Sequence, residues 1–281
     1  MQAVYEDYIK ILSQKLRYMV GIVSMYLLAV SVSDSTAFAV ENRGVVKVAS
    51  ASNFLLPLRY LKAKFEQQFP YQLKVSAGST AKLYAQVLNG APYDVFLAAD
   101  DVTTSMLVKQ GLSLPEGAFL YAQGQLVLWG PNEKYQTPEL LKQDFISAKF
   151  SRLAMANPKT APYGRAATEV MSYFELKVKR NSYIYGESVG QAFQFTASGN
   201  VDMGFVALSQ ILSNRRIVGK AVDGKSSPGS YWLPPEHTYK PIYQHGIVLK
   251  ESQRKEGVRA FVGFLKSPET QKILRQRFGY L

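Results

Sequence analysis

The chain contains no cysteine. Structural disulfides, thiolate metal sites, a cysteine nucleophile and a lipid-modified N-terminal cysteine are therefore excluded. Histidine is scarce as well, since only His237 and His245 occur, and they lack the spacing of a histidine metal site. We accordingly expect no cofactor and no metal ion held directly by side chains. Acidic residues are fewer than basic ones, with 21 aspartates and glutamates against 33 lysines and arginines. The resulting net charge of +12 favours anionic partners.

Long runs of like charge are also missing, because the basic residues are scattered along the chain with no more than two adjacent. A protein that follows a nucleic-acid backbone needs many phosphate contacts, so we expect no nucleic-acid partner. We read the positive charge as a long-range attraction for small anions, although most individual lysines are expected to be ordinary solvated surface residues.

Long apolar runs are limited to one, which extends over residues 18–32 near the N-terminus. Lys15 and Arg17 precede this run, and Ala37-Phe38-Ala39 follows it, which is the layout of a secretory signal peptide. The run is short for a bilayer span, which needs about twenty residues. We expect residues 1–39 to be a signal peptide, with the mature protein beginning near Val40 in the periplasm. An uncleaved anchor is the alternative, because a long segment precedes Lys15.

The remainder of the chain alternates apolar segments typical of strands with amphipathic segments typical of helices. Expected strands cover residues 45–49, 73–76, 94–98, 125–129, 152–156, 183–185, 203–206 and 243–249, and expected helices begin near residues 52, 80, 138, 164, 189, 257 and 268. This alternation predicts an α/β protein with mainly parallel sheets flanked by helices. Ligands of such sheets bind beyond the carboxyl ends of the strands. Residues 224–235, rich in glycine, serine and proline, indicate a surface loop.

Several helix ends can be located from single residues. Ser79 is a natural N-cap for a helix from Thr80 to Leu88, and Ser267 plays the same part for the last helix. Gly279 is expected to stop that last helix.

Several segments together resemble the periplasmic molybdate-binding proteins of ABC importers. They are VKVASASNF (residues 46–54), AGSTAKLYAQVLNGAPYDVFLAAD (77–100), LAMANPKTAPYGRAA (153–167), GESVGQAF (186–193), MGFVALSQ (203–210) and the C-terminal RFGYL. The Ser-Thr pair followed by NGAPYDVFLAAD is the most specific of these. The resemblance covers nearly the whole mature chain.

The resemblance implies a periplasmic binding protein with two α/β lobes and the ligand in the cleft between them. Lobe one would comprise residues 44–124 and 240–281, lobe two residues 125–239, with crossovers near Gln125 and Tyr239. It further implies a monomer that captures molybdate or tungstate and delivers it to the membrane permease of an ABC importer. Molybdenum would then be held as its oxyanion.

The family's ligand positions fall on Ser52, Asn53, Ser79, Tyr163 and Val189, the last through its backbone N–H. One branch of the family has a ligand tyrosine where this chain has Ala207, so Asn53 and Tyr163 are the expected replacement donors.

These positions suit a tetrahedral dianion, because each lies where a helix is expected to begin. A helix start carries free N–H groups and a positive partial charge. The serine hydroxyls, the Asn53 amide and the Tyr163 phenol would add neutral donors, and Gly78 and Gly164 would allow close approach of the backbone. None of the positions is acidic. A site made of donors favours a fully deprotonated anion, since the proton of hydrogen phosphate would find no acceptor.

A secreted serine hydrolase is the alternative function. Residues Gly186-Glu187-Ser188-Val189-Gly190 match the nucleophile elbow pattern between an expected strand and helix, and both histidines lie downstream. The match is short, and a catalytic triad must be shown by geometry rather than by sequence order.

Overall fold

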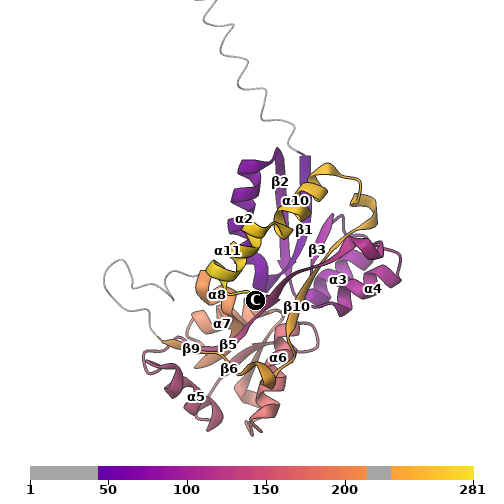
Figure 1. Ribbon diagram of the computed structural model, residues 1–281. Coiled ribbons are helices and arrows are strands. Elements are labelled where there is room, and N and C mark those ends of the chain that lie inside the picture. The colour runs from indigo at the N-terminus through magenta and orange to yellow at the C-terminus, as the bar shows by residue number, and fades with distance from the viewer. Residues whose placement is uncertain (1–43, 214–228) are drawn as a thin grey trace, which may run out of the picture. The chain divides into compact units, whose positions relative to one another are not determined.

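The computed structural model describes residues 44–213 and 229–281, which lie within one compact unit, Gly44–Leu281 (Figure 1). The expected signal peptide at residues 1–39 lies outside the described residues, as does the 224–228 part of the expected loop. Among the helices of the described ranges, none is long and apolar enough to cross a membrane.

Two five-stranded sheets organise this unit, and we name the first of them sheet A. Its strand order is β2-β1-β3-β10-β4, with bounds β1 Gly44–Ala51, β2 Tyr71–Gly78, β3 Val95–Leu97, β4 Ala118–Gly124 and β10 Ile242–Val248. β1 pairs in parallel with β2 and β3, whereas β10 is antiparallel to both β3 and β4. All strands except β10 therefore run in the same direction.

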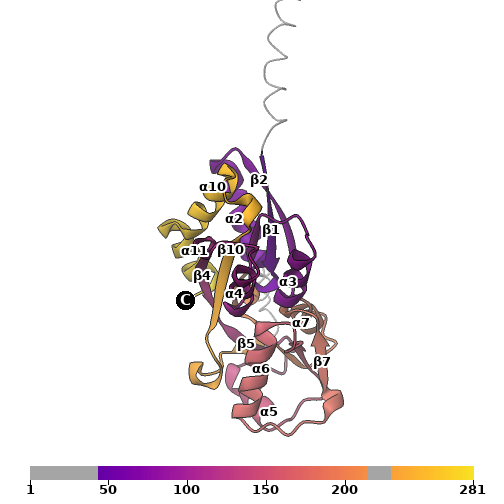
Figure 2. The same cartoon turned by 90° about the vertical axis from the view of Figure 1, so that its right-hand side faces the viewer.

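Helices cover both faces of sheet A (Figures 1 and 2). One face packs against α2 (Leu55–Gln68), α10 (Glu256–Lys266) and α11 (Pro268–Phe278) in a core rich in phenylalanine. The other face packs against α3 (Thr80–Leu88) and α4 (Val102–Lys109). We call sheet A and these helices the first lobe.

Sheet B repeats the same pattern in the second lobe. Its order is β7-β6-β8-β5-β9, with bounds β5 Leu126–Gly130, β6 Leu153–Ala156, β7 Tyr183–Gly186, β8 Met203–Ala207 and β9 Ser230–Trp232. β6 is parallel to β7 and β8, and β5 is the strand of opposite direction. One face packs against α5 (Pro138–Ile146) and α6 (Pro162–Tyr173), the other against α7 (Val189–Ala197) and α8 (Leu208–Ser213). The predicted two-lobed class with mainly parallel sheets is confirmed.

The sequence pattern located most elements and missed β4, β9 and α8. β4 mixes aromatic, small and polar residues without a clear alternation, so its sequence gives no strand period. β9 lies inside the expected surface loop and pairs only with β5, at the edge of sheet B, so the prediction of an uninterrupted loop was wrong there. α8 has six residues, too few to show a helical period.

The chain crosses from sheet A to sheet B through a very short connection. Gln125 is the single residue between β4 and β5, and its side-chain amide donates to the Gly279 carbonyl at 2.7 Å. Its own carbonyl accepts from the Leu208 N–H at 2.9 Å. At the preceding Gly124, a Cβ would overlap the Tyr163 hydroxyl and the Gln244 amide, so only glycine fits. The return crossing lies between β9 and β10.

Candidate functional site

Four turns at the carboxyl ends of parallel strands form the candidate site. β1 and β2 end in register, with Ala51 opposite Gly78, so Ser52 and Ser79 follow at neighbouring positions. β6 and β7 also end in register in sheet B, and the chain continues from them into α6 and α7. Parallel pairing alone thus places two helix starts side by side in each lobe.

Direct contacts bring the turns of the two lobes together. The Gly190 N–H in the first turn of α7 donates to the Ser52 Oγ at 3.0 Å. The Ala81 N–H in the first turn of α3 donates to the Thr160 carbonyl at 3.2 Å. Ion pairs also cross between the lobes, Lys82 with Glu187 at 3.1 Å and Arg165 with Asp100 at 2.8 Å.

A pocket of about 450 Å³ lies at three of these turns, those that follow β1, β2 and β7. Three serines that stand at helix starts line it together with Gly190, namely Ser52, Ser79 and Ser188. The charged residues that line it are Lys82 and Glu187, which pair with each other and are largely exposed. The polar surface of this pocket is therefore mostly neutral, with the charged pair at its rim.

The serine hydroxyls of the pocket accept hydrogen bonds from the protein and keep their own protons available for a ligand. Ser52 Oγ accepts from Gly190, Ser79 Oγ accepts from the Lys82 N–H at 3.4 Å, and Ser188 Oγ accepts from the Gln191 N–H at 3.4 Å. Within residues 44–213 and 229–281, no hydrogen bond has any of these three hydroxyls as the donor. Because a hydroxyl carries one proton and two lone pairs, each can still give its proton to an anion.

Val189 and Tyr163 carry further backbone N–H groups at helix starts, although neither residue lines this pocket. Val189 is the first residue of α7, and Tyr163 follows Pro162 at the start of α6. An N–H group in the first turn of a helix has no acceptor within that helix, and the helix dipole places positive partial charge there. A negative group at such a position is stabilised without a formal cation.

The side chains of Asn53 and Tyr163 do not line this pocket. Both are almost completely buried and meet at the carboxamide of Gln244. The Asn53 Nδ2 donates to Gln244 Oε1 at 2.9 Å, and Gln244 Nε2 donates to the Tyr163 hydroxyl at 3.2 Å. The sequence analysis predicted that the Asn53 amide and the Tyr163 phenol donate hydrogen bonds to the ligand. In the structure the Asn53 amide donates to Gln244 and the Tyr163 hydroxyl accepts from Gln244, and neither residue lines the pocket.

The buried polar cluster around Gln244 is uncharged at neutral pH. Burial raises the pKa of Tyr163 and of Tyr121 well above the usual value, and it also raises the pKa of Tyr280. These phenols therefore stay protonated. The cluster holds the turns through neutral hydrogen bonds and adds no negative charge beside the pocket.

The glycines near the turns have different roles from those expected. A Cβ on Gly164 would overlap the Ala156 carbonyl, so this glycine allows α6 to approach β6 rather than a ligand. A Cβ on Gly78 would make only an ordinary contact with Leu83 at 3.5 Å, so no close approach requires glycine there. Gly190, which the sequence analysis named only as part of the nucleophile-elbow pattern, would place a Cβ 3.0 Å from the Ser52 Cβ.

Ser188, the serine of the nucleophile-elbow pattern, has no histidine beside it to form a catalytic triad. Ser188 is the N-cap of α7, and neither histidine lines its pocket. His237 Nε2 lies 3.1 Å from the Tyr173 hydroxyl, and His245 is part of β10. In the part of the chain that the structure describes, no group of three or more histidine, aspartate or glutamate side chains could hold a metal ion.

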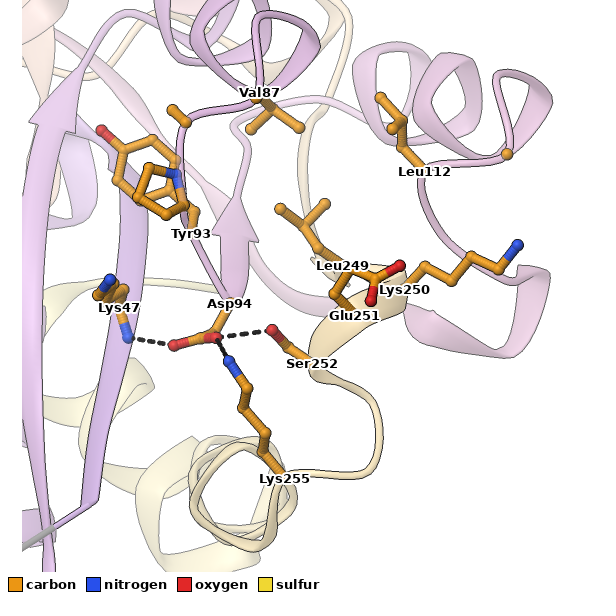
Figure 3. A pocket seen from close by; sticks show the side chains of 14 residues that line it. Lys47, Val87, Tyr93, Asp94, Leu112, Leu249, Lys250, Glu251, Ser252 and Lys255 are labelled. Carbon is orange, nitrogen blue, oxygen red and sulfur yellow. Dashed lines mark hydrogen bonds and ion pairs between the residues drawn. The ribbon is translucent and has the colours of Figure 1, made fainter.

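A second cavity, of about 370 Å³, lies beside sheet A and is lined by Asp94 (Figure 3). The Asp94 carboxylate accepts from the Lys47 N–H at 2.7 Å, the Ser252 hydroxyl at 2.6 Å and the Lys255 ammonium at 2.7 Å. Its hydrogen-bonding capacity is thus used within the first lobe, where it ties β1 to the segment before α10. We regard this cavity as structural.

The fold and the donor-lined pocket define a binding protein, and the chain belongs to the family of bacterial extracellular solute-binding proteins. The family model matches residues 46–281. Proteins of this family act outside the cytoplasm and bind solutes for transport rather than catalysing a reaction.

Particular relatives narrow the comparison. The chain is 38% identical over 238 residues to the molybdate-binding protein ModA of Azotobacter vinelandii, covering 84% of this chain and 89% of the relative. It is 36% identical over 244 residues to the molybdate-binding protein ModA of Rhodobacter capsulatus, covering 85% and 88%. Among solved structures, the A. vinelandii periplasmic molybdate-binding protein matches with a TM-score of 0.74 and 36% identity over 84% of this chain and 98% of that one.

Sequence reasoning missed three contributors to this region: Ser188 as a pocket residue, Gly190 and Gln244. Ser188 could have been found, because serine followed three residues later by Gln191 matches a capping box at the start of α7. No local pattern reveals the contact of Gly190 with Ser52 or the role of Gln244, because both residues contact residues far away in the sequence.

Proposed function

We propose that this protein captures molybdate outside the cytoplasm and delivers it to the membrane permease of an ABC importer. The observation that carries the proposal is the group of serine hydroxyls at helix starts, which surround one pocket with their protons free to donate. Two relatives and a solved structure at 36–38% identity are molybdate-binding proteins by name, which supports molybdate as the anion.

The proposed ligand residues are Ser52, Asn53, Ser79, Tyr163 and Val189. Ser52 and Ser79 donate through their hydroxyls. Asn53, Tyr163 and Val189 donate through backbone N–H groups, because each lies in the first turn of a helix and the side chains of the first two are buried beside Gln244. The resulting set draws donors from both lobes, so a bound anion would hold the lobes together.

The donor character of the set also accounts for the choice among anions. A fully deprotonated tetrahedral dianion satisfies donors on every side. The proton of hydrogen phosphate would be left without an acceptor, which costs roughly 1–3 kcal/mol. Tungstate has the same charge and shape as molybdate, and we propose it as a second ligand of the same site.

The lobe boundaries and the export signal complete the proposal. We place the first lobe at residues 44–124 and 240–281, the second at residues 125–239, and a cleaved signal peptide at residues 1–39. N-terminal sequencing of periplasmic material should begin near Val40, and light scattering on the purified protein should give the mass of a monomer. An intact N-terminus in the membrane fraction would instead support an anchor.

Calorimetric titration of the mature protein with molybdate, tungstate, sulfate and phosphate tests the function. We expect tight 1:1 binding of molybdate and tungstate, and binding of phosphate that is weaker by roughly 5- to 150-fold. Small-angle scattering should show a smaller radius of gyration with molybdate present. Absence of molybdate binding, or a preference for phosphate, would contradict the proposal.

A further inference from the structure

Gln244 lies at the centre of a buried polar cluster that touches both lobes. Its side chain is fully buried in β10. Its Oε1 accepts from Asn53 Nδ2 and from the Tyr121 hydroxyl, each at 2.9 Å. Its Nε2 donates to the Tyr163 hydroxyl at 3.2 Å. One carboxamide therefore joins the turn after β1, strand β4 and the first turn of α6.

The Asn53 backbone carbonyl is held from both lobes as well. It accepts from the Ser209 hydroxyl of α8 at 2.9 Å and from the Tyr280 hydroxyl at 3.3 Å. Asn53 thus has its side chain and its carbonyl fixed, which leaves little freedom for the direction of its N–H. A backbone donor is useful to a ligand only when its direction is set in advance.

We propose that Gln244 is a positioning residue for anion binding, which aligns the Asn53 turn of the first lobe with the Tyr163 turn of the second. This inference rests on the proposed function, since it concerns how the donors of that site converge. Gln244 does not line the pocket, and it acts through Asn53 and Tyr163. A carboxamide suits this position because it offers an acceptor and a donor at a fixed separation.

The place of the Gln244–Tyr163 bond explains why it can control alignment. It lies against Gly124, where a Cβ would overlap both partners, and Gly124 ends β4 just before the crossing to sheet B. The bond therefore spans the lobes next to the connection about which they would turn. Small changes of angle there produce larger displacements at the pocket.

The test replaces Gln244 with methionine, which has similar length and no hydrogen-bonding amide. Gln271→Met is the matched control, because the Gln271 amide donates to the Tyr121 and Leu265 carbonyls within the first lobe. We expect Gln244→Met to raise the Kd for molybdate at least tenfold. Gln271→Met should lower the free energy of unfolding of the ligand-free protein and leave the Kd within twofold of wild type.

Tyr163→Phe removes the same bond from the other lobe and serves if Gln244→Met fails to fold. We expect it to raise the Kd several-fold, and we expect the double variant to bind no more weakly than Gln244→Met alone. Wild-type affinity in both single variants, or fully additive losses in the double variant, would overturn the positioning role of Gln244. The proposed function would still stand in that case, provided that the wild-type protein binds molybdate. Failure of the wild-type protein to bind molybdate would instead reject the proposed function itself.

Discussion

Gly190→Ala is the substitution that most directly tests whether the lobes meet at the pocket as described. Gly190 lies in the first turn of α7 and its N–H donates to Ser52 across the interface. A Cβ at this position would lie 3.0 Å from the Ser52 Cβ and 3.2 Å from the Ser52 Oγ. Carbon atoms in good contact are about 3.5–4.0 Å apart, so the two lobes would have to separate by a few tenths of an ångström.

The size of the effect follows from the cost of overpacking. An added methyl group in a well-packed contact costs typically 1–3 kcal/mol. This cost arises only when the lobes are together, so it reduces ligand affinity and not the stability of the separate lobes. At about 1.4 kcal/mol for each tenfold change, the Kd for molybdate should rise roughly 5- to 150-fold. The helix itself should tolerate alanine, which is the better helix former.

Gly263→Ala is the matched control, because Gly263 lies in α10 and a Cβ there would meet no atom within 4 Å. Calorimetry should give the control variant the wild-type Kd, and urea unfolding should show it more stable by roughly 0.5–1 kcal/mol. If Gly190→Ala also binds molybdate with wild-type affinity, the contact between Ser52 and Gly190 is not part of the ligand-bound protein, and the pocket geometry described above is wrong.

Three further predictions concern a cap, an ion pair and a buried carboxylate. Ser79→Ala should cost about 1 kcal/mol of stability and raise the Kd at least tenfold, whereas Thr137→Ala, which removes the N-cap of α5, should cost as much stability and leave the Kd unchanged. Arg165→Gln removes the interlobe pair with Asp100 and should weaken binding no more than about fivefold at low salt, because exposed pairs contribute about 0.2–1 kcal/mol; a larger loss would give this pair a direct part in binding. Burial opposes ionisation of Asp94, but the hydrogen bonds from Lys255, Lys47 and Ser252 outweigh it and lower its pKa below the usual 3.8. Its contribution to stability is therefore present above about pH 4 and lost as the pH falls through the lowered pKa, and urea unfolding of Asp94→Asn should lack that part of the acid dependence.

The sequence contained enough information for the class of fold and for most helix starts. Ser79 and Ser267 cap α3 and α11 as predicted, and Gly279 ends α11 in a left-handed conformation. These are local effects, in which one side chain bonds the backbone three residues away. The strands β4 and β9 were not predicted, because their stability comes from pairing with distant strands rather than from their own residues.

The site was predicted unevenly for the same reason. Ser52 and Ser79 were identified as ligand positions through the resemblance to the molybdate-binding family, and the structure places both in one pocket, each between a strand and a helix. The directions of the Asn53 and Tyr163 side chains could not be read, since both depend on Gln244, which is 191 and 81 residues away from them respectively. The contact of Gly190 with Ser52 could not be predicted, because Ser52, which leaves little room for a Cβ there, lies in the opposite lobe.

The position of β10 in sheet A has a consequence for the order in which the protein can form. β4 pairs with β10 in sheet A, and β10 lies between it and β3, so β4 cannot join the sheet before residues 242–248 are available. Sheet B, in contrast, needs no strand beyond Trp232. A chain that emerges from its N-terminus can therefore complete the second lobe early, while the first lobe waits for the last segment of the protein. A product shortened before β10 would keep a foldable second lobe but would expose unpaired strand edges in the first, and we expect it to aggregate rather than to bind weakly.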